Sequence, residues 1–337
     1  VDERKNPDLT CLVEATRTVA RYLKRGDYVV YESTVYPGCT EEVCVPLLEK
    51  GSGLKLGADF KVGYSPERIN PNDSEHTFSN TAKIVSANDG QALDEVARVY
   101  AEVVAADLCR ASGIRVAEAA KMTENVQRSV NIALMNELQR LFSRMGIDMG
   151  EVIDMASSKW NFVKYRPGLG GGHCIPVDPL YLVSAASKLG VEMPVTSSGC
   201  AVNDGMAAYV VRSLLGAMGS DGRGARALLM GVTYKENIDD IRNSRIAEMV
   251  GLLEREGMSV DVTDPHADPD KVYAMYGIRP VPALRPPYDL IVVAVAHDEY
   301  RGLDDAYFRS ISRGAALLGD ICGLYKGRIK SLGYWSL

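Results

Sequence analysis

The sequence predicts an α/β protein with two doubly wound parallel-sheet domains joined by a helical central domain, the first α/β domain being incomplete. Three observations support this prediction. Short β-rich runs alternate with amphipathic helical stretches toward both ends of the chain, as in layered α/β proteins. A single long helical stretch separates the two alternating regions, and a glycine-rich linker precedes the second one.

The first α/β region begins with a helix that leads into a buried strand. Helical periodicity covers Leu9–Arg25, and the β-rich run Tyr28–Tyr31 follows. After this strand, Pro37-Gly38 leads into a further helical stretch, and shorter strands are expected at Phe60–Tyr64 and Lys83–Ser86. Because α/β proteins bind ligands at the carboxyl edge of a parallel sheet, the residues after Tyr31 lie at a candidate site.

The central region is dominated by one helix, predicted over Ile114–Arg144. No Pro or Gly interrupts it, and it exceeds the usual three or four turns. Helices of this length commonly connect domains or form dimer interfaces. A glycine-rich loop, Gly168–Cys174, precedes another helix, for which we expect Asp178 as N-cap and Pro179 as first residue.

The second α/β region follows the linker Gly216–Gly224. Strands are expected at Ala227–Met230, Ser259–Val262 and Leu290–Val295, with a helix over Ser244–Glu256. Such alternation indicates a doubly wound parallel sheet. The predicted domains are residues 1–112, 113–215 and 216–337.

One feature of dinucleotide-binding folds is absent from these residues. Such a site normally needs a strand, a GxGxxG turn, a helix and an acid about 20 residues further on, and the sequence contains no such unit. The chain also begins at a helix without the strands that it should cover, and without an initiator Met. We therefore expect the first domain to lack its N-terminal βαβ part.

Composition excludes several classes of function. A net charge of −6 without a basic block gives no support for nucleic-acid binding. The seven cysteines show no CxxC pair and no zinc-ligand spacing, so we expect no metal site and reduced thiols in the cytoplasm. No apolar stretch approaches the roughly 20 residues of a membrane span, and no signal peptide is evident.

Two features are candidates for chemistry, each with a plainer alternative. Lys121, Asn125 and Arg128 share one helical stripe, which could equally be a solvated face. Cys174 follows three glycines and precedes a helix start, where backbone N–H groups can stabilise a thiolate. The alternative is a small buried thiol. Asp178 could likewise be no more than a helix cap.

Several motifs, taken together, favour the functional interpretation of these residues over the plainer structural one. Over nearly the whole chain they resemble the UDP-glucose/GDP-mannose dehydrogenase family in order and spacing. They are Tyr31–Gly38, Tyr64–Pro71, Glu118–Lys121 with Glu124-Asn125, Asn136-Glu137, Gly171–Pro179, and Lys235 with Asp240–Arg242.

The resemblance implies an NAD-dependent, four-electron oxidation of the C6 alcohol of a UDP-linked sugar to a carboxylate. Two hydride transfers to NAD would pass through an aldehyde and a Cys174 thioester. Lys121 and Asn125 match residues that stabilise oxyanion charge, and Glu67 matches the base that hydrolyses the thioester. Thr34 and Asp178 match residues that hold the catalytic water. The first and third domains would then be Rossmann-like domains for NAD and UDP.

The resemblance also assigns binding residues. Positions that match substrate contacts are Arg68, Ile69, Arg128, Arg166, Gly170, Gly171 and Lys235. Positions that match NAD contacts are Ser33, Thr34 and Arg242. The central domain would form a homodimer or a higher homo-oligomer.

Two departures resemble the branch that acts on UDP-N-acetylglucosamine or UDP-N-acetylgalactosamine for surface-polysaccharide synthesis. Pro71 replaces the second acid common in UDP-glucose enzymes, and Trp160–Gly168 differs from the pattern of UDP-N-acetylmannosamine enzymes. Oxidation of UDP-glucose or UDP-N-acetylmannosamine stays open as an alternative. So does a non-catalytic nucleotide-sugar-binding fragment.

Overall fold

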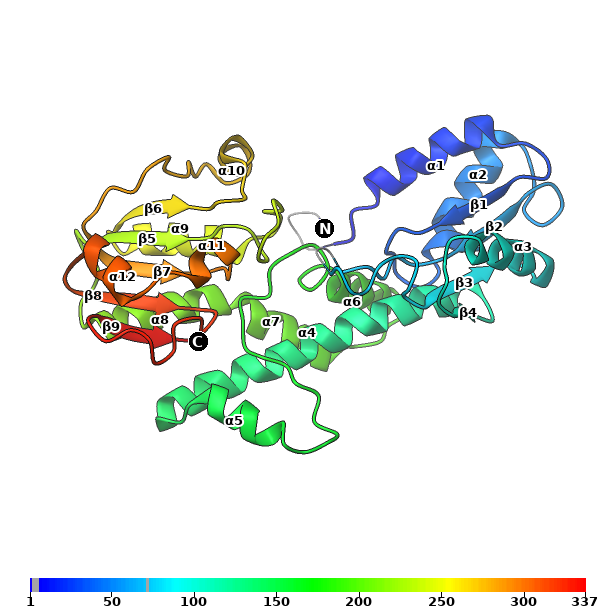
Figure 1. The fold of residues 1–337 in the computed structure, drawn as a ribbon. Coiled ribbons are helices and arrows are strands. Elements are labelled where there is room, and N and C mark those ends of the chain that lie inside the picture. Colours follow the sequence, from blue (N-terminus) through cyan, green and yellow to red (C-terminus); the bar gives the residue numbers. More distant parts are fainter. Residues whose placement is uncertain (2–5, 71–72) are drawn as a thin grey trace. The chain divides into compact units, whose positions relative to one another are not determined.

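The computed structural model describes residue 1 and residues 6–70 and 73–337, which form two compact units (Figure 1). Unit 1 comprises residues 1–128 and 177–197, and unit 2 comprises residues 129–176 and 198–337. Helix α4 (Ile114–Met145) contributes its N-terminal part to unit 1 and the rest to unit 2, and it confirms the predicted long helix. Pro71 lies outside the described residues.

Unit 1 contains a four-stranded sheet in the order β1-β2-β3-β4. The strands are β1 (Tyr28–Tyr31), β2 (Lys61–Tyr64), β3 (Lys83–Ala87) and β4 (Leu108–Arg110). The helices are α1 (Thr10–Tyr22), a π-helical turn η1 (Thr40–Cys44), α2 (Val45–Ser52), α3 (Gly90–Ala101) and α6 (Asp178–Lys188). Helix α7 (Pro194–Asp204) begins in unit 1 and ends in unit 2.

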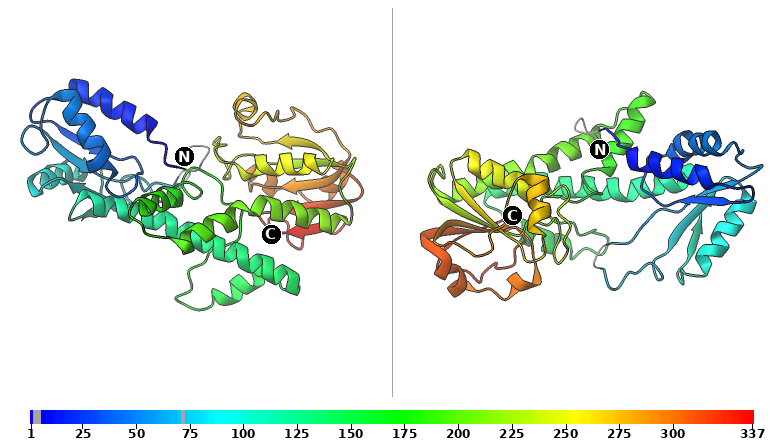
Figure 2. Two further views of the ribbon diagram at one scale, coloured as in Figure 1. Left: turned by 180° about the vertical axis from the view of Figure 1, so that it is seen from behind. Right: turned by 90° about the horizontal axis from the view of Figure 1, so that it is seen from above.

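Alternating side chains give this sheet a helical layer on each face. Val29 and Tyr31 of β1 pack in the core with α1 and α2, whereas Val30 packs with α3. Strand β3 repeats the pattern, because Ile84 belongs to the first core and Val85 to the second. Helices α1 and α2 therefore cover one face and α3 the other (Figure 2).

The sheet of unit 1 departs from a wholly parallel pattern at one pair. Strands β1 and β2 are parallel, as are β3 and β4, but β2 and β3 pair antiparallel. A parallel pair needs a crossover, usually a helix. The described part of the connection between β2 and β3 contains no helix, and the chain returns in the opposite direction.

Unit 2 contains a five-stranded, wholly parallel sheet in the order β6-β5-β7-β8-β9. The strands are β5 (Arg226–Met230), β6 (Ser259–Thr263), β7 (Tyr288–Val293), β8 (Ser312–Asp320) and β9 (Gly333–Ser336). The helices are α5 (Met149–Ala156), α8 (Met206–Met218), α9 (Arg245–Arg255), α10 (Pro269–Tyr276), α11 (Asp298–Arg301) and α12 (Asp305–Ile311).

Residues of successive strands again alternate between two cores. Leu229 and Val292 pack with α8 and α9, whereas Leu228 and Val293 pack on the opposite face with residues of α11 and α12 (Figure 1). The strand predicted at Leu290–Val295 begins two residues earlier, at Tyr288. Both faces are covered, which confirms the predicted doubly wound architecture for this region.

No helix within residues 6–70 and 73–337 combines the length and the apolar character that a membrane span requires.

Close packing of α8 on β8 gives a stability prediction. A Cβ added at Gly319 would lie 2.5 Å from Leu214 Cδ2, which is fully buried. Gly319→Ala should therefore lower the free energy of unfolding by about 1–3 kcal/mol, measured by chemical denaturation. Gly251→Ala is the control, because nothing lies within 4 Å of its added Cβ, and it should be neutral or slightly stabilising. Equal stability of Gly319→Ala and the unaltered protein would contradict this packing.

Candidate functional site

Thr34 and Glu67 follow neighbouring parallel strands of unit 1. Tyr31 of β1 pairs with Tyr64 of β2, so the residues after both strands leave the sheet at the same edge. The hydroxyl of Tyr64 donates to the carbonyl of Ser33 at 3.2 Å, which holds the backbone beside Thr34. The structure thus brings Ser33, Thr34 and Glu67 to one edge of the sheet.

Helix α4 carries Lys121 and Asn125 as buried groups. Their exposed fractions are 8% and 6%, so the alternative of a solvated face is wrong for both. Arg128, the third member of the stripe, is exposed. The amide of Asn125 donates to Asp178 Oδ2 at 2.5 Å. Lys121, Asn125 and Asp178 therefore form one buried polar group within unit 1.

Asp178 is the first residue of α6, and the expectation that it caps this helix is wrong. The N-cap is Val177, and no side chain caps the helix. The physical reason is that the Asp178 carboxylate accepts from Asn125 instead. Burial raises the pKa of Asp178 to about 6, although the Asn125 hydrogen bond and the Lys121 charge oppose this change. This carboxyl can therefore exchange a proton close to neutral pH.

Glu118 ties α4 to the turn that follows β1. Its side chain is fully buried and accepts from the backbone N–H of Gly38 at 2.6 Å and of Thr40 at 2.9 Å. Burial raises the pKa of Glu118 against the lowering effect of hydrogen bonds from the Thr40 side chain and from these two N–H groups. The bonds fix the turn after Thr34 relative to the helix that carries Lys121.

Glu67 and Arg68 are held by local contacts. Glu67 Oε1 accepts from the backbone N–H of Arg68 at 2.6 Å and of Ile69 at 2.7 Å. The Arg68 guanidinium donates to the carbonyl of Ala82 at 2.7 Å and pairs with Glu124 of α4 at 2.8 Å. Arg68 therefore links the loop of Glu67 to the same helix.

Lys83 is a buried cation that sequence analysis missed. It is 4% exposed, and its ammonium donates to the carbonyl of Pro66 at 3.3 Å and lies 3.4 Å from Glu32. The rings of Phe78 and Tyr100 flank it at 4.9 and 5.2 Å from their centroids. The sequence feature that could have indicated this buried cation is a lysine in a strand whose other residues are mostly apolar.

Cys174 belongs to unit 2, where the glycine-rich loop packs on Tyr234. An added Cβ at Gly171 would lie 3.1 Å from Tyr234 Cβ, and one at Gly172 would lie 2.9 Å from the Tyr234 ring. Gly172 also has φ of +96°, and its carbonyl accepts from Asn243 at 3.1 Å. Glycine is therefore required beside Cys174, whose thiol is free of disulfides and partly exposed.

Arg242 lies next to this loop. Its guanidinium makes several hydrogen bonds with Asp240, the shortest at 2.6 Å, and approaches His173 Nδ1 at 3.4 Å. Lys235 lies in the same segment between β5 and α9. Two predicted ligand contacts, Lys235 and Arg242, thus share one loop, and that loop contacts the residues before Cys174.

A cavity of about 1040 Å³ within unit 2 gathers further predicted residues. Arg166, Gly170 and Gly171 line it, together with Arg245 and Lys326, which sequence analysis missed. Aromatic and aliphatic side chains complete the wall, among them Tyr234, Tyr334, Trp335 and Ile153. Cationic groups, glycine backbone and aromatic rings together suit a nucleotide diphosphate.

Each cation of this cavity has an acidic partner. Arg166 lies 3.5 Å from Asp154, and Lys326 lies 2.6 Å from Asp148. Arg245 pairs with Asp204. Arg245 and Asp204 form the best-buried of these pairs, whereas the other two pairs are largely exposed. No sequence pattern links each cation to its acidic partner.

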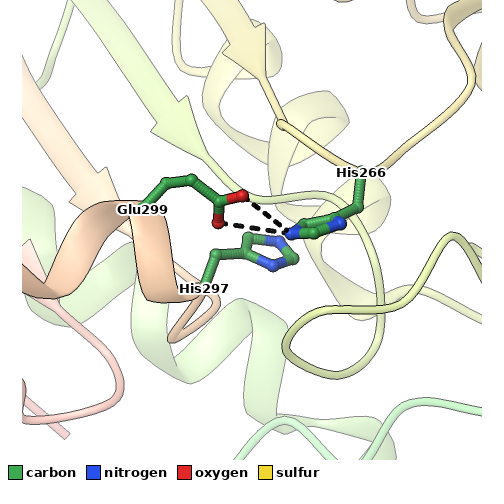
Figure 3. A group of neighbouring side chains, drawn as sticks. All are labelled: His266, His297 and Glu299. Atoms are coloured by element: carbon green, nitrogen blue, oxygen red, sulfur yellow. Dashed lines mark hydrogen bonds and ion pairs between the residues drawn. The ribbon is translucent and has the colours of Figure 1, made fainter. Parts of the chain in front are cut away.

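His266, His297 and Glu299 form a group of potential metal ligands in unit 2 (Figure 3). His266 Nε2 lies 3.2 Å from Glu299. However, His297 Nδ1 accepts from the backbone N–H of Asn237 at 3.0 Å, and its Nε2 faces Asp264 at 3.2 Å. Both ring nitrogens are occupied, so the group does not fit a metal ion.

Comparison with known proteins places these features in a family. Residues 1–104, 115–205 and 228–327 match the NAD binding, central and UDP binding domains of the UDP-glucose/GDP-mannose dehydrogenase family. The chain is 47% identical over 325 residues to UDP-N-acetyl-D-glucosamine 6-dehydrogenase of Pseudomonas aeruginosa, covering 95% of this chain and 77% of that protein. The chain belongs to the UDP-glucose/GDP-mannose dehydrogenase family.

Other relatives support the same family assignment. A protein of the same name from Salmonella typhi is 45% identical, over 95% of this chain and 76% of that protein. Among solved structures, UDP-N-acetylmannosamine dehydrogenase of Pyrococcus horikoshii has a TM-score of 0.88 at 27% identity, over 99% of this chain and 78% of that one. The predicted family and fold class are confirmed.

Family membership also confirms the predicted enzyme class, an NAD-dependent nucleotide-sugar dehydrogenase, with NAD as cofactor. Ser33 and Thr34 lie at the sheet edge of unit 1, within the matched NAD-binding segment, and this position suits a nucleotide. In the corresponding turn after β5 in unit 2, the N–H groups of Val232 and Thr233 already donate to Asp264.

Asp178 supports a pH prediction. Its pKa in the fold, about 6, exceeds the ordinary value of 3.8 for an aspartate in an unfolded chain, so ionisation in the buried site costs stability as pH rises between these values. Asp178→Asn removes that cost. Its free energy of unfolding should gain roughly 2–3 kcal/mol relative to the unaltered protein between about pH 4 and pH 7, measured by denaturation.

A stability difference between Asp178→Asn and the unaltered protein that stays flat over this pH range would show that the carboxyl of Asp178 is not desolvated in the fold.

Proposed function

We propose that the protein oxidises the C6 alcohol of UDP-N-acetylglucosamine or UDP-N-acetylgalactosamine to the uronate, for surface-polysaccharide synthesis. The relatives named UDP-N-acetyl-D-glucosamine 6-dehydrogenase are 47% and 45% identical, whereas two named UDP-N-acetyl-D-mannosamine dehydrogenase are 29% and 31% identical. UDP-glucose and UDP-N-acetylmannosamine are the alternative substrates, and substrate profiling of the purified enzyme separates them.

The observation that supports this chemistry most directly is the buried polar group on α4. Lys121 and Asn125 are buried next to Asp178 although charged and amide side chains are usually exposed. Burial strengthens their interaction with developing negative charge, because water does not screen it. We assign both as donors to the oxyanion that forms when a nucleophile adds to the C6 aldehyde.

Cys174 is the proposed nucleophile. A thiolate adds to the aldehyde carbon to form a hemithioacetal, and loss of hydride from that carbon leaves a thioester. NAD supplies the hydride acceptor when it is bound. Water then attacks the thioester carbon, and the Cys174 sulfur leaves as the thiolate while the carboxylate forms.

Hydrolysis needs a base and an oriented water. Glu67 is proposed as the base, and its Oε1 is already fixed by two backbone N–H groups, so that Oε2 is the oxygen that takes the proton. Thr34 and Asp178 are proposed to hold the water. A pKa of about 6 lets Asp178 take part in proton transfer near neutral pH.

Binding roles are proposed for the remaining matched residues. Cations and close backbone approach suit the diphosphate of the sugar nucleotide. The proposed substrate contacts are Arg68, Ile69, Arg128, Arg166, Gly170, Gly171 and Lys235. The proposed NAD contacts are Ser33, Thr34 and Arg242.

We further propose three domains, residues 1–112, 113–215 and 216–337, and self-association through α4. Exposed Leu134, Leu141 and Met145 share one face of that helix at i, i+7 and i+11, which supports a homodimer contact. All seven cysteines are free, which supports a reducing compartment, the cytoplasm.

Replacement of the nucleophile tests the thioester chemistry. In the full-length enzyme, Cys174→Ser should lower uronate formation by at least about 10³-fold, because a serine hydroxyl is a poor nucleophile at neutral pH. NADH formation and product analysis measure the change. Cys109→Ser, at an exposed thiol of β4, should leave the rate unaltered. Near-normal uronate production by Cys174→Ser would remove Cys174 from the mechanism.

Glu67→Gln separates oxidation from hydrolysis. Hydride transfer does not need the hydrolytic base, whereas release of the thioester does. Rapid mixing with substrate and NAD should therefore give a burst of NADH followed by slow turnover, with a covalent adduct on Cys174 in mass spectra. Glu14→Gln, at an exposed position of α1, should turn over normally. Slow turnover without burst or adduct would assign Glu67 another role.

A further inference from the structure

The loop between β5 and α9 in unit 2 concentrates residues that the proposed function uses. Tyr234 supports Gly171 and Gly172, and Arg242 contacts His173. Lys235 lies in the same loop and is a proposed substrate contact. The position of this loop therefore affects both the substrate cavity and the segment that carries Cys174.

A buried histidine from the next strand holds this loop. His297 follows β7 and is fully buried. Its Nδ1 accepts from the backbone N–H of Asn237 at 3.0 Å, and the N–H of Asp298 donates to Asn237 Oδ1 at 3.0 Å. Asn237 has φ of +58°, a conformation that is uncommon for residues other than glycine. The hydrogen bond from its N–H thus secures one of the two asparagines between β5 and α9, Asn237 and Asn243, whose φ is positive.

The hydrogen-bond directions determine the form of the ring. A backbone N–H can only donate, so Nδ1 of His297 presents a lone pair to Asn237 and the ring proton is on Nε2. That proton points to Asp264 Oδ2 and Thr233 Oγ1, both at 3.2 Å. The Thr233 hydroxyl donates onward to the carbonyl of Lys235 at 2.9 Å. One imidazole therefore reaches the loop at two points, Asn237 and Thr233.

Asp264, which follows β6, is the acidic partner of His297 in this group of hydrogen bonds. Its carboxylate accepts the N–H groups of Val232 and Thr233 through Oδ2 and those of His266 and Ala267 through Oδ1. It retains these four donors whatever side chain stands at 297. The N–H of Asn237, by contrast, donates to His297 Nδ1, and a side chain without an acceptor at this position would remove that hydrogen bond.

We propose that His297 is a positioning residue that sets the Tyr234–Arg242 loop for nucleotide-sugar binding and catalysis, through the hydrogen bond between its Nδ1 and Asn237. This inference rests on the proposed function. His297 is fully buried beneath the loop and acts through it, and a lone pair at the Nδ1 position is the property that matters.

Two substitutions test the roles of the two ring nitrogens of His297 separately. Asparagine at 297 places an oxygen close to the Nδ1 position, and glutamine places an amide close to the Nε2 position. His297→Asn should therefore keep the acceptor for Asn237, whereas His297→Gln should keep only the donor to Asp264. The full-length protein and both variants are compared by calorimetric titration with UDP, by kcat and KM, and by thermal unfolding.

His297→Gln should weaken UDP binding by about ten-fold or more and lower kcat/KM further, as expected for loss of an ordered contact loop. His297→Asn should keep UDP affinity within about three-fold of the unaltered protein. A role limited to stability would lower the unfolding temperature of the two variants without separating their UDP affinities, and this result would overturn the inference. Failure of the unaltered protein to bind UDP would instead overturn the proposed function.

Discussion

A buried carboxylate must find hydrogen-bond donors, and each unit meets this requirement with backbone N–H groups at the edge of its sheet. In unit 1, Glu118 of α4 accepts from Gly38 and Thr40 after β1. In unit 2, Asp264 after β6 accepts from four N–H groups, two of them in the turn after β5. Loops that carry proposed site residues are thereby held against regular structure, which gives them defined positions.

The number of donors decides how each carboxyl titrates. Two N–H donors and the Thr40 side chain do not offset the burial of Glu118, and its pKa is raised. Asp178 has one side-chain donor and a nearby lysine, and its pKa is raised to about 6. Burial also opposes ionisation of Asp264, but the hydrogen bonds from four N–H groups and from His297 have the larger effect. They hold the pKa of Asp264 well below its usual value. Asp264 therefore serves as a permanent anion, and Asp178 is suited to proton exchange.

Glycine has a different role near Cys174. Gly171 and Gly172 let the backbone lie close against Tyr234, where an added Cβ would be crowded at Gly171 and would clash with the ring at Gly172. The flexibility of a glycine loop is thus removed by packing, and Asn243 adds a hydrogen bond to the Gly172 carbonyl. A nucleophile needs this order, because small displacements of reacting groups cost large factors in rate.

The sequence by itself determined the local elements and the identity of the chemistry. Period-2 and period-3.6 patterns located β1, β5, β6 and the whole of α4, because those patterns depend only on neighbouring residues. Strands β4, β8 and β9 were not predicted. In β4 and β9, three or four residues carry little periodicity, whereas the nine-residue β8 begins directly after helix α12, so no break in the pattern marks its start. Motif order indicated the family, which relatives at 45–47% identity confirm.

Only the tertiary structure decided which side chains are buried and what they contact. It showed that Lys121 and Asn125 are buried while Arg128 on the same stripe is exposed, and that Asp178 accepts from Asn125 rather than capping α6. Neither Lys83 nor His297 was marked by a sequence motif. Their partners come from other strands and loops, and the free energy of a buried polar group is set by such distant partners, which periodicity along one segment cannot record.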